Sequence, residues 1–162
     1  MGMTMSDAAA EPVTAIPIQI NAQYVKDLSF ESPRAPKSLQ PTKEQPKVDV
    51  HVDVKANKLS DGVFEVTLAT TVNGSNNDGQ LFLVELTYAG VFSLKGISEE
   101  HLQAVLLIEC PRLLFPYARS ILSDVTRDGG FPPLLIQPVD FAHLYRQSLE
   151  TGNLGRSEEP AL

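Results

Sequence analysis

The feature that most constrains the fold of this chain is an alternation of apolar and polar residues that recurs four times within residues 16–88. It is clearest at Val48–Val54, where every second residue is valine and the residues between them are aspartate or histidine. Successive side chains of a β-strand point to opposite faces, so this period predicts strands with one buried face. The stretches lie at about residues 16–31, 48–54, 64–72 and 82–88.

The first of these stretches is unusually long. Its apolar residues keep one parity from Ile16 to Phe30, interrupted only by Lys26, which predicts a single strand with one buried face. Prolines at positions 33, 36, 41 and 46 follow and predict an extended crossover without a helix or hairpin. A turn at 57–62 and a hairpin loop at 73–79 are expected to connect the other strands. The first strand is therefore free to lie at an edge, where it could pair with a second copy.

The second half of the chain carries helical periodicity. Ser98 is a candidate N-cap for a helix that runs to about Cys110. Pro116 is expected in the first turn of a longer second helix, where its missing N–H costs nothing, and Gly129–Gly130 is expected to end that helix. The apolar residues of the second helix recur along one face: Leu114, Ala118, Ile121, Leu122 and Val125.

Beyond that helix, Phe131–Ile136 is apolar but too rich in proline for a central strand, so it either covers a core or lines a groove. A last short helix is predicted from Phe141 to about Leu149, with Asp140 as its N-cap. Four strands followed by helices indicate an α+β fold, with a four-stranded antiparallel sheet followed by a long helix and shorter helices. We expect residues 16–150 to form a single domain between flexible tails at 1–15 and 151–162.

Composition narrows the functional class. The 162 residues are 43% hydrophobic and 20% charged, which is typical of a soluble globular protein. A formal charge of −7 argues against nucleic acid as a partner and suits a basic partner or a cationic client segment. The single cysteine excludes an internal disulfide and fits a reducing cytosol. No apolar run approaches the ~18 residues that span a bilayer and no signal peptide is evident, so we expect a cytoplasmic protein without direct membrane insertion.

The residues indicate no catalytic, metal or cofactor site. The histidines lie at no metal-ligand spacing from one another, and His51 between Asp49 and Asp53 is interpreted as part of a solvated strand face. No glycine-rich nucleotide-binding motif occurs in the sequence. One alternative stays open, namely an enzyme or carrier with an apolar small-molecule cavity, in which Cys110 or a histidine would be the catalyst.

Two motifs in the second half of the chain point to a family. L-F-P-Y-A-R (Leu114–Arg119), followed by G-F-P-P-L-L-I-Q-P-V-D-F (Gly130–Phe141), resembles the signature of SecB, the bacterial protein-export chaperone. The likeness extends through Tyr24–Pro33, Phe82–Leu86 and Gly90–Ile97, and it covers roughly residues 18 to 147. The resemblance implies a SecB-like fold that assembles as a homotetramer, a dimer of dimers.

The resemblance also implies a function. SecB-like proteins are ATP-independent chaperones that bind unfolded secretory precursors, keep them translocation-competent and deliver them to the translocation ATPase SecA. Many of them carry a tryptophan on the crossover shortly before Q-P, whereas Glu44 stands there in this chain, which has no Trp. The candidate client-binding residues, each of which could instead simply cover the core, are Phe30, Leu39, Tyr117, Phe131, Leu134 and Leu135.

Two further residue sets follow from the resemblance. The positions that match the SecA contact set of the family are Asp27, Glu31, Leu83 and Glu85. Positions tied to assembly in the family match Val84, Leu86 and Tyr88, which could equally be plain core. A related chaperone dedicated to a toxin–antitoxin pair is a second alternative, because the same fold could serve it.

Overall fold

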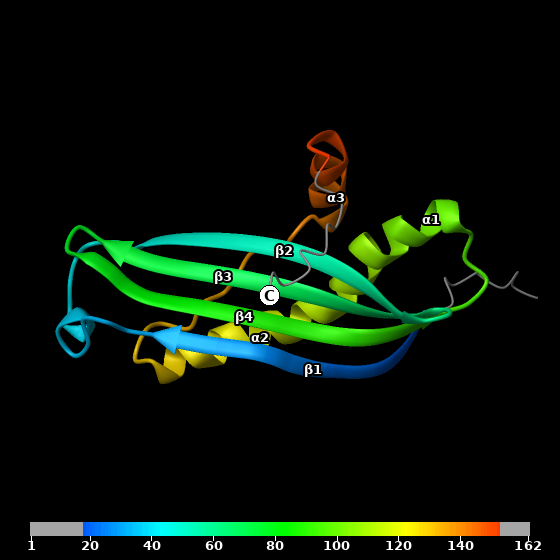
Figure 1. Ribbon diagram of the computed structural model, residues 1–162. Coiled ribbons are helices and arrows are strands. Elements are labelled where there is room, and N and C mark those ends of the chain that lie inside the picture. The colour runs from blue at the N-terminus through cyan, green and yellow to red at the C-terminus, as the bar shows by residue number, and fades with distance from the viewer. Residues whose placement is uncertain (1–17, 153–162) are drawn as a thin grey trace, which may run out of the picture.

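The computed structural model describes residues 18–152, so the predicted tail at 1–15, the start of the first strand at Ile16 and most of the tail at 151–162 lie outside it. The described residues form one antiparallel sheet in the order β1-β4-β3-β2, followed by helices (Figure 1). This arrangement confirms the predicted α+β class. The elements are β1 (Ile18–Glu31), β2 (Lys47–Ser60), β3 (Val63–Asn76), β4 (Gly79–Leu94), α1 (Glu99–Ala104), α2 (Cys110–Asp128) and α3 (Phe141–Glu150).

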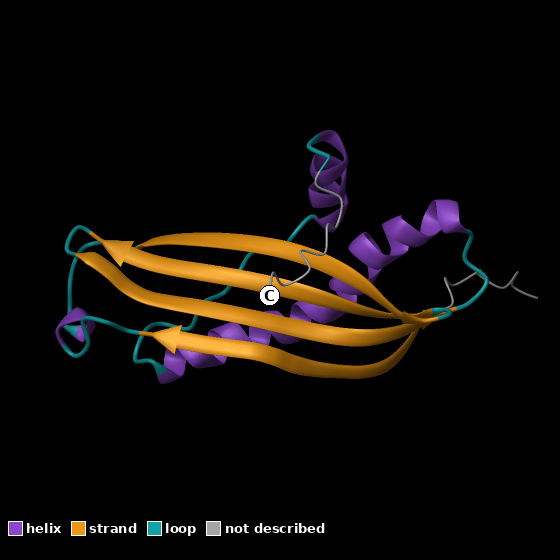
Figure 2. Cartoon of the chain, in the orientation of Figure 1, coloured by secondary structure: helices purple, strands orange, loops and turns teal. Residues whose placement is uncertain are grey.

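The core lies between the sheet and α2, which crosses one face of the sheet (Figure 2). On β3 the alternation is complete, because Phe64, Val66 and Leu68 are buried while the residues between them are partly exposed. The helix contributes Leu114, Ala118 and Leu122 to the same core, as its periodicity predicts. We call this side of the sheet the helix face and the opposite side the outer face.

The connections place β1 and β2 at opposite edges of the sheet. Tight turns join β2 to β3 at Asp61–Gly62 and β3 to β4 at Asn77–Asp78, within the ranges that the sequence predicts. Residues 32–46 form the crossover loop, which runs around one end of the sheet (Figure 1). Residues 33–39 of this loop form turns, and Lys37–Leu39 is a short 3-10 helix, so the prediction of an extended crossover without a helix is wrong for this part of the loop. The predicted edge position of the first strand is confirmed.

The single apolar parity predicted for the first strand is wrong. β1 pairs with β4 through two register shifts, one between Ile20 and Ala22 and one between Val25 and Asp27. Each shift adds a residue and so exchanges the faces to which the following side chains point. Tyr24, between the two shifts, therefore lies on the outer face, whereas Phe30 is back on the helix face.

The first two predicted helices form one continuous run. A π-helical segment, Val105–Glu109, joins α1 to α2, and the Cys110 N–H bonds to the Val105 carbonyl five residues earlier. Pro111 has no N–H and its ring would clash with the carbonyl four residues before it, so the helix widens at this point. Pro116 lies inside α2 and not in its first turn, contrary to prediction. Its ring is exposed, so water can bind the carbonyl that loses its partner.

Two helix ends follow their predicted signals. At the end of α2, Gly130 adopts a φ of 89° and donates its N–H to the Arg127 carbonyl, while the Phe131 N–H bonds to the Thr126 carbonyl. This is the Schellman arrangement, which needs a residue tolerant of left-handed backbone. At the start of α3, the Asp140 carboxylate accepts the His143 N–H at 3.0 Å.

Candidate functional site

An aromatic cluster lies where the crossover loop, the sheet and the end of α2 meet. Phe131 follows α2, and its ring centroid lies 4.9 Å from that of Phe82 and 6.5 Å from that of Phe30. Two glycines make this packing possible. A Cβ at Gly129 would lie 2.3 Å from the Phe30 ring, and one at Gly130 would lie 3.2 Å from the Leu39 methyls. Leu39 is 41% exposed.

The structure thus brings together three of the predicted groove residues, which are Phe30, Leu39 and Phe131. It adds Phe82, which sequence reasoning assigned only to a strand core. Phe82 pairs with Gly74 on β3, and a Cβ at Gly74 would lie 2.5 Å from its ring. The glycine opposite a strand phenylalanine is the signal that could have placed this ring in a cluster instead of a flat sheet surface.

A groove of about 640 Å³ runs along β2. Its walls are β2 on one side and the loop Phe131–Asp140 with α3 on the other. Leu134 lines it, and Leu135 is 77% exposed at its rim. A smaller hollow of about 120 Å³ shares Val52 and Leu144 with the groove and extends it to Val54.

Sequence reasoning missed the β2 wall of the groove. Val48 and Val50 were interpreted as core, yet they are 39% and 42% exposed, because β2 is an edge strand and none of the described helices covers it at this end. His51 and Asp53 also line the two hollows, although their side chains project from the outer face of the sheet. The hollows therefore open onto the backbone edge of β2 as well as onto its apolar side chains.

The rim of the groove is anchored to the helix by Thr126, which is fully buried. Its hydroxyl donates to the carbonyls of Leu122 and Ser123, at 2.9 and 3.0 Å, and accepts the Leu134 N–H at 2.9 Å. One side chain thus positions the proline-rich loop relative to α2. Sequence reasoning did not single out this residue, because a threonine near a helix end usually serves only its own helix.

Tyr117 lies apart from the other predicted groove residues, about three turns of α2 before Gly129. It is 53% exposed and stacks on Tyr88 with ring centroids 6.0 Å apart. The Tyr88 hydroxyl donates to Gln23 on β1, and burial, with a smaller contribution from Tyr117, raises the pKa of Tyr88 above its ordinary value. The neighbouring helix face of β1 carries a row of exposed apolar side chains, Ile20, Val25 and Leu28.

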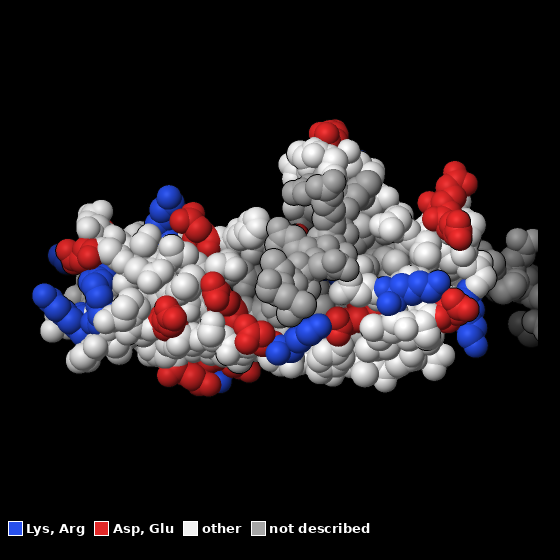
Figure 3. All heavy atoms as spheres, in the orientation of Figure 1, with Lys and Arg blue, Asp and Glu red and all other residues white. Residues whose placement is uncertain are grey.

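The predicted SecA-contact residues share the outer face. Glu31 pairs with Leu83, Ser29 with Glu85 and Asp27 with Thr87, so all four predicted side chains lie on two adjacent strands of that face. Figure 3 shows this face, with acidic side chains along its middle and most basic ones towards its ends. On the same face, the Glu65 carboxylate of β3 forms an ion pair with Lys26 of β1 at 2.8 Å and accepts a hydrogen bond from the Tyr24 hydroxyl, also on β1.

The three assembly positions lie in the core of the single chain. Val84, Leu86 and Tyr88 are on the helix face of β4, and their exposure is 0%, 2% and 7%. This placement matches the alternative stated in the sequence analysis, in which these three residues belong to the core. The exposed apolar surface nearest to them belongs to β1 and to Tyr117.

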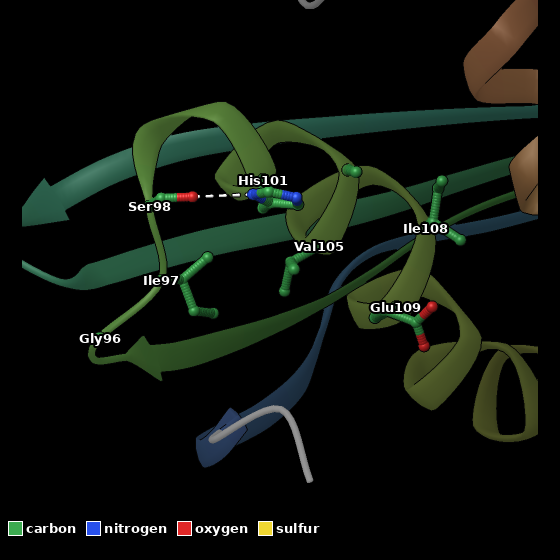
Figure 4. A pocket seen from close by; sticks show the side chains of 8 residues that line it. Gly96, Ile97, Ser98, His101, Val105, Ile108 and Glu109 are labelled. Atoms are coloured by element: carbon green, nitrogen blue, oxygen red, sulfur yellow. Dashed lines mark hydrogen bonds between the residues drawn. The ribbon is translucent and has the colours of Figure 1, made fainter. Parts of the chain in front are cut away.

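A separate apolar hollow of about 450 Å³ lies beside α1. Figure 4 shows Ile97 and Val105 on facing sides of it, with the Ser98 hydroxyl 2.8 Å from His101 Nδ1 at one end. Cys110, the proposed nucleophile of the alternative enzyme, is fully buried. Burial, together with the Glu109 carboxylate, raises the pKa of its thiol to about 12, so the thiol stays protonated at neutral pH.

Within residues 18–152, no three side chains of the metal-binding types gather closely enough to hold an ion. His51 and its aspartate neighbours are therefore not a metal site in the described part of the chain. Among the helices that the structure describes, none is both long and apolar enough to cross a membrane.

Comparison with known proteins decides the family. The model of the family described as "SecB: Preprotein translocase subunit SecB" matches residues 11–152. The chain belongs to the SecB family. Relatives named "Protein-export protein SecB" include those of Bradyrhizobium sp., 53% identical over 87% of this chain and 88% of the relative, and Bartonella quintana, 43% identical over 97% of each.

A solved structure gives the same fold. It is a SecB-like chaperone of Mycobacterium tuberculosis in complex with a ChAD peptide from the HigA1 antitoxin, with a TM-score of 0.63 and 20% identity over 75% of this chain and 90% of that one. At this identity the likeness shows the fold alone. The predicted resemblance to SecB and the SecB-like fold of one chain are both confirmed, and with the family the predicted role in protein export.

Proposed function

We propose that this SecB-family chain is an ATP-independent chaperone that binds unfolded secretory precursors in the groove along β2 and delivers them to SecA. The observation that carries the proposal is the groove itself, in which valine and leucine side chains remain accessible beside the edge of β2, where no other strand of the described residues pairs. Apolar surface of this kind usually marks a binding site for another macromolecule. The SecB family is not an enzyme family, and the buried, protonated Cys110 does not favour a catalytic role.

Unfolded segments fit this groove as extended chain. The backbone edge of β2 over residues 48–54 is about 20 Å long, and both hollows lie along it. An added strand can form main-chain hydrogen bonds there with little regard to sequence, while its alternate side chains contact Val50, Leu134 and Leu144. Binding through the backbone and apolar contacts explains how one groove can accept many precursors.

The loop opposite β2 is suited to weak but broad binding. Pro132, Pro133 and Pro138 restrict its backbone, and Thr126 anchors it, so little conformational entropy is lost when a client binds. Each groove alone is expected to bind weakly, because association and client ordering consume most of the burial energy. Several grooves on one particle raise retention by about 10²–10⁴ when one client chain occupies more than one of them.

We further propose that the chain works in the cytoplasm as a homotetramer, a dimer of dimers. Two features support assembly, namely the free edge of β1 and the exposed row of Ile20, Val25 and Leu28 beside Tyr117. An exposed apolar edge strand is an aggregation risk unless another chain covers it. In this proposal Val84, Leu86 and Tyr88 act on assembly indirectly, by supporting the packing of α2 and β1.

Delivery requires a surface that a client does not cover. The outer face, with Asp27, Glu31, Glu85 and the apolar Leu83, lies on the side of the sheet opposite the groove. We propose it as the SecA-docking surface. Glu85→Lys is expected to abolish SecA binding and leave precursor binding intact; retained SecA binding would favour a chaperone dedicated to another partner.

The proposed function is tested by mixing the purified protein with a denatured secretory precursor. We expect scattering-derived masses of a tetramer and of a larger complex, and refolding of the precursor slowed in proportion to occupied grooves. A protein that stays monomeric and leaves the refolding rate unchanged would contradict the proposal. Leu135→Asp serves as the groove variant, and Lys55→Ala, on the outer face, is the matched control.

A further inference from the structure

A basic side chain, Lys26, lies on the outer face beside one of the acidic residues proposed to dock SecA. The register of β1 against β4 shifts between Val25 and Asp27, so Lys26 is the extra residue of the second bulge. Its ammonium reaches Glu65 on β3, and Asp27, the next residue, lies on the same face. Consecutive residues of a regular strand point to opposite faces, so it is the bulge that brings these two charges onto one face. A lysine thus stands directly next to a carboxylate of the docking surface.

The Glu65 carboxylate is bound by two side chains of β1. Its Oε1 forms an ion pair with Lys26 Nζ at 2.8 Å, and its Oε2 accepts a hydrogen bond from the Tyr24 hydroxyl. Each oxygen therefore has its own partner, and the carboxylate is held in one orientation toward the lysine. Burial opposes its ionisation, but these hydrogen bonds lower the pKa of Glu65 below its ordinary value, so the carboxylate is charged at neutral pH.

Exposure separates the carboxylates that a partner can reach from the one that it cannot. The Glu65 side chain is only 13% exposed, whereas Asp27, Glu31 and Glu85 are exposed. A lysine released from Glu65 has a flexible four-carbon stem, and the exposed carboxylate nearest to it along the strand is that of Asp27. Pairing with Lys26 would neutralise this carboxylate. The outer face would then offer one charged contact fewer to a cationic partner.

We propose that Glu65 is a positioning residue of the docking surface, which holds the Lys26 ammonium and thereby leaves the Asp27 carboxylate free for a cationic group of the partner. The inference rests on the proposed function, in which that partner is SecA. Tyr24 supports the same role, because its hydroxyl orients the Glu65 carboxylate. Glu65 acts on docking only through the lysine, so its effect exists only while Lys26 is present.

The test uses the full-length protein in its native assembly and purified SecA, with the Kd measured by isothermal titration calorimetry. Glu65→Gln keeps the size of the side chain and an acceptor for Tyr24, but it loses the charge that holds Lys26. We expect this variant to bind SecA about 3- to 10-fold more weakly at low salt. The loss should shrink as the salt concentration rises, because salt screens the interactions of exposed charges. Tyr24→Phe leaves the carboxylate charged and should weaken binding in the same direction by less.

Removal of the lysine separates this role from a structural one. Lys26→Met should bind SecA at least as tightly as the wild type. The double variant Glu65→Gln/Lys26→Met should regain wild-type affinity, because no ammonium is left to pair with Asp27, whereas a purely structural role of Glu65 predicts no such rescue. The matched control is Glu65→Gln/Lys55→Met, which has the same net charge and removes a lysine from the same face but keeps Lys26. This control should remain weaker than the wild type.

The outcomes distinguish this inference from the function on which it rests. If the wild type does not bind SecA, the proposed docking fails and this inference with it. If the wild type binds and Glu65→Gln binds equally well, or if Lys26→Met rescues no better than Lys55→Met, only the role of Glu65 is refuted. Weaker binding by Lys26→Met alone would show that the ammonium itself contacts SecA, which also refutes the role. Should Glu65→Gln fail to assemble, Tyr24→Phe decides, and an unchanged affinity in that variant refutes the role.

Discussion

Thr126→Val is the substitution that most directly tests how the groove is held open. Valine keeps the shape of the side chain but removes the hydroxyl that accepts the Leu134 N–H and donates to two helix carbonyls. The carbonyls keep their helical partners, so the main loss is one partly buried amide left without an acceptor. Such a loss lowers the free energy of unfolding by about 1–3 kcal/mol. Because water has partial access to Leu134, we expect a loss of about 1–2 kcal/mol here.

Two measurements check this prediction. In a chain of this length, about 1–2 kcal/mol corresponds to a Tm lower by about 2–8 °C. The more specific readout is hydrogen exchange, in which the Leu134 amide should lose its protection while amides of β3 keep theirs. Thr126→Ser is the matched control, because it retains the hydroxyl and loses only a methyl group. Unchanged exchange at Leu134 in Thr126→Val, or equal losses in both variants, would refute the reasoning.

Three further predictions concern the groove rim, the outer face and the buried thiol. Leu135→Asp should change the free energy of unfolding by less than about 0.5 kcal/mol, since Leu135 is 77% exposed, yet weaken precursor binding measured by refolding delay. Burial alone would raise the pKa of Glu65, but hydrogen bonds from Lys26 and Tyr24 lower it below its ordinary value of 4.5. The ionised Glu65 should therefore stabilise the folded state above pH 4.5. This stabilisation should be lost as the pH falls through the lower pKa that Glu65 has in the folded protein. Glu65→Gln should flatten that part of the acid-denaturation curve; an unaltered curve would contradict this assignment. Cys110 should resist maleimide labelling at neutral pH until the chain unfolds, because its thiol is buried with a pKa of about 12, and rapid labelling of the native protein would contradict that placement.

Much of the fold could be predicted because its signals are local. The alternation along β3 matches its buried face residue by residue, Asp140 caps α3, and Gly130 ends α2 in the left-handed conformation. Each of these features depends on the period of the side chains or on the backbone φ preference of a single residue. A short stretch of sequence is enough to specify either one. The grouping of Asp27, Glu31, Leu83 and Glu85 on one face follows from the same parity, once β1 and β4 are paired.

The sequence by itself determined the strands, the helices, their order and the family, since period, caps and motifs are properties of short segments. Only the tertiary structure decided which residues form the groove. The two bulges of β1 turn Tyr24 to the outer face, Pro116 is accommodated within α2, and Phe82 joins a cluster because Gly74 and Gly129 leave room for rings. Val48 and Val50 are exposed because β2 is an edge strand and no helix within residues 18–152 covers it at that end. These outcomes depend on contacts between segments far apart in the chain, which the local pattern does not specify.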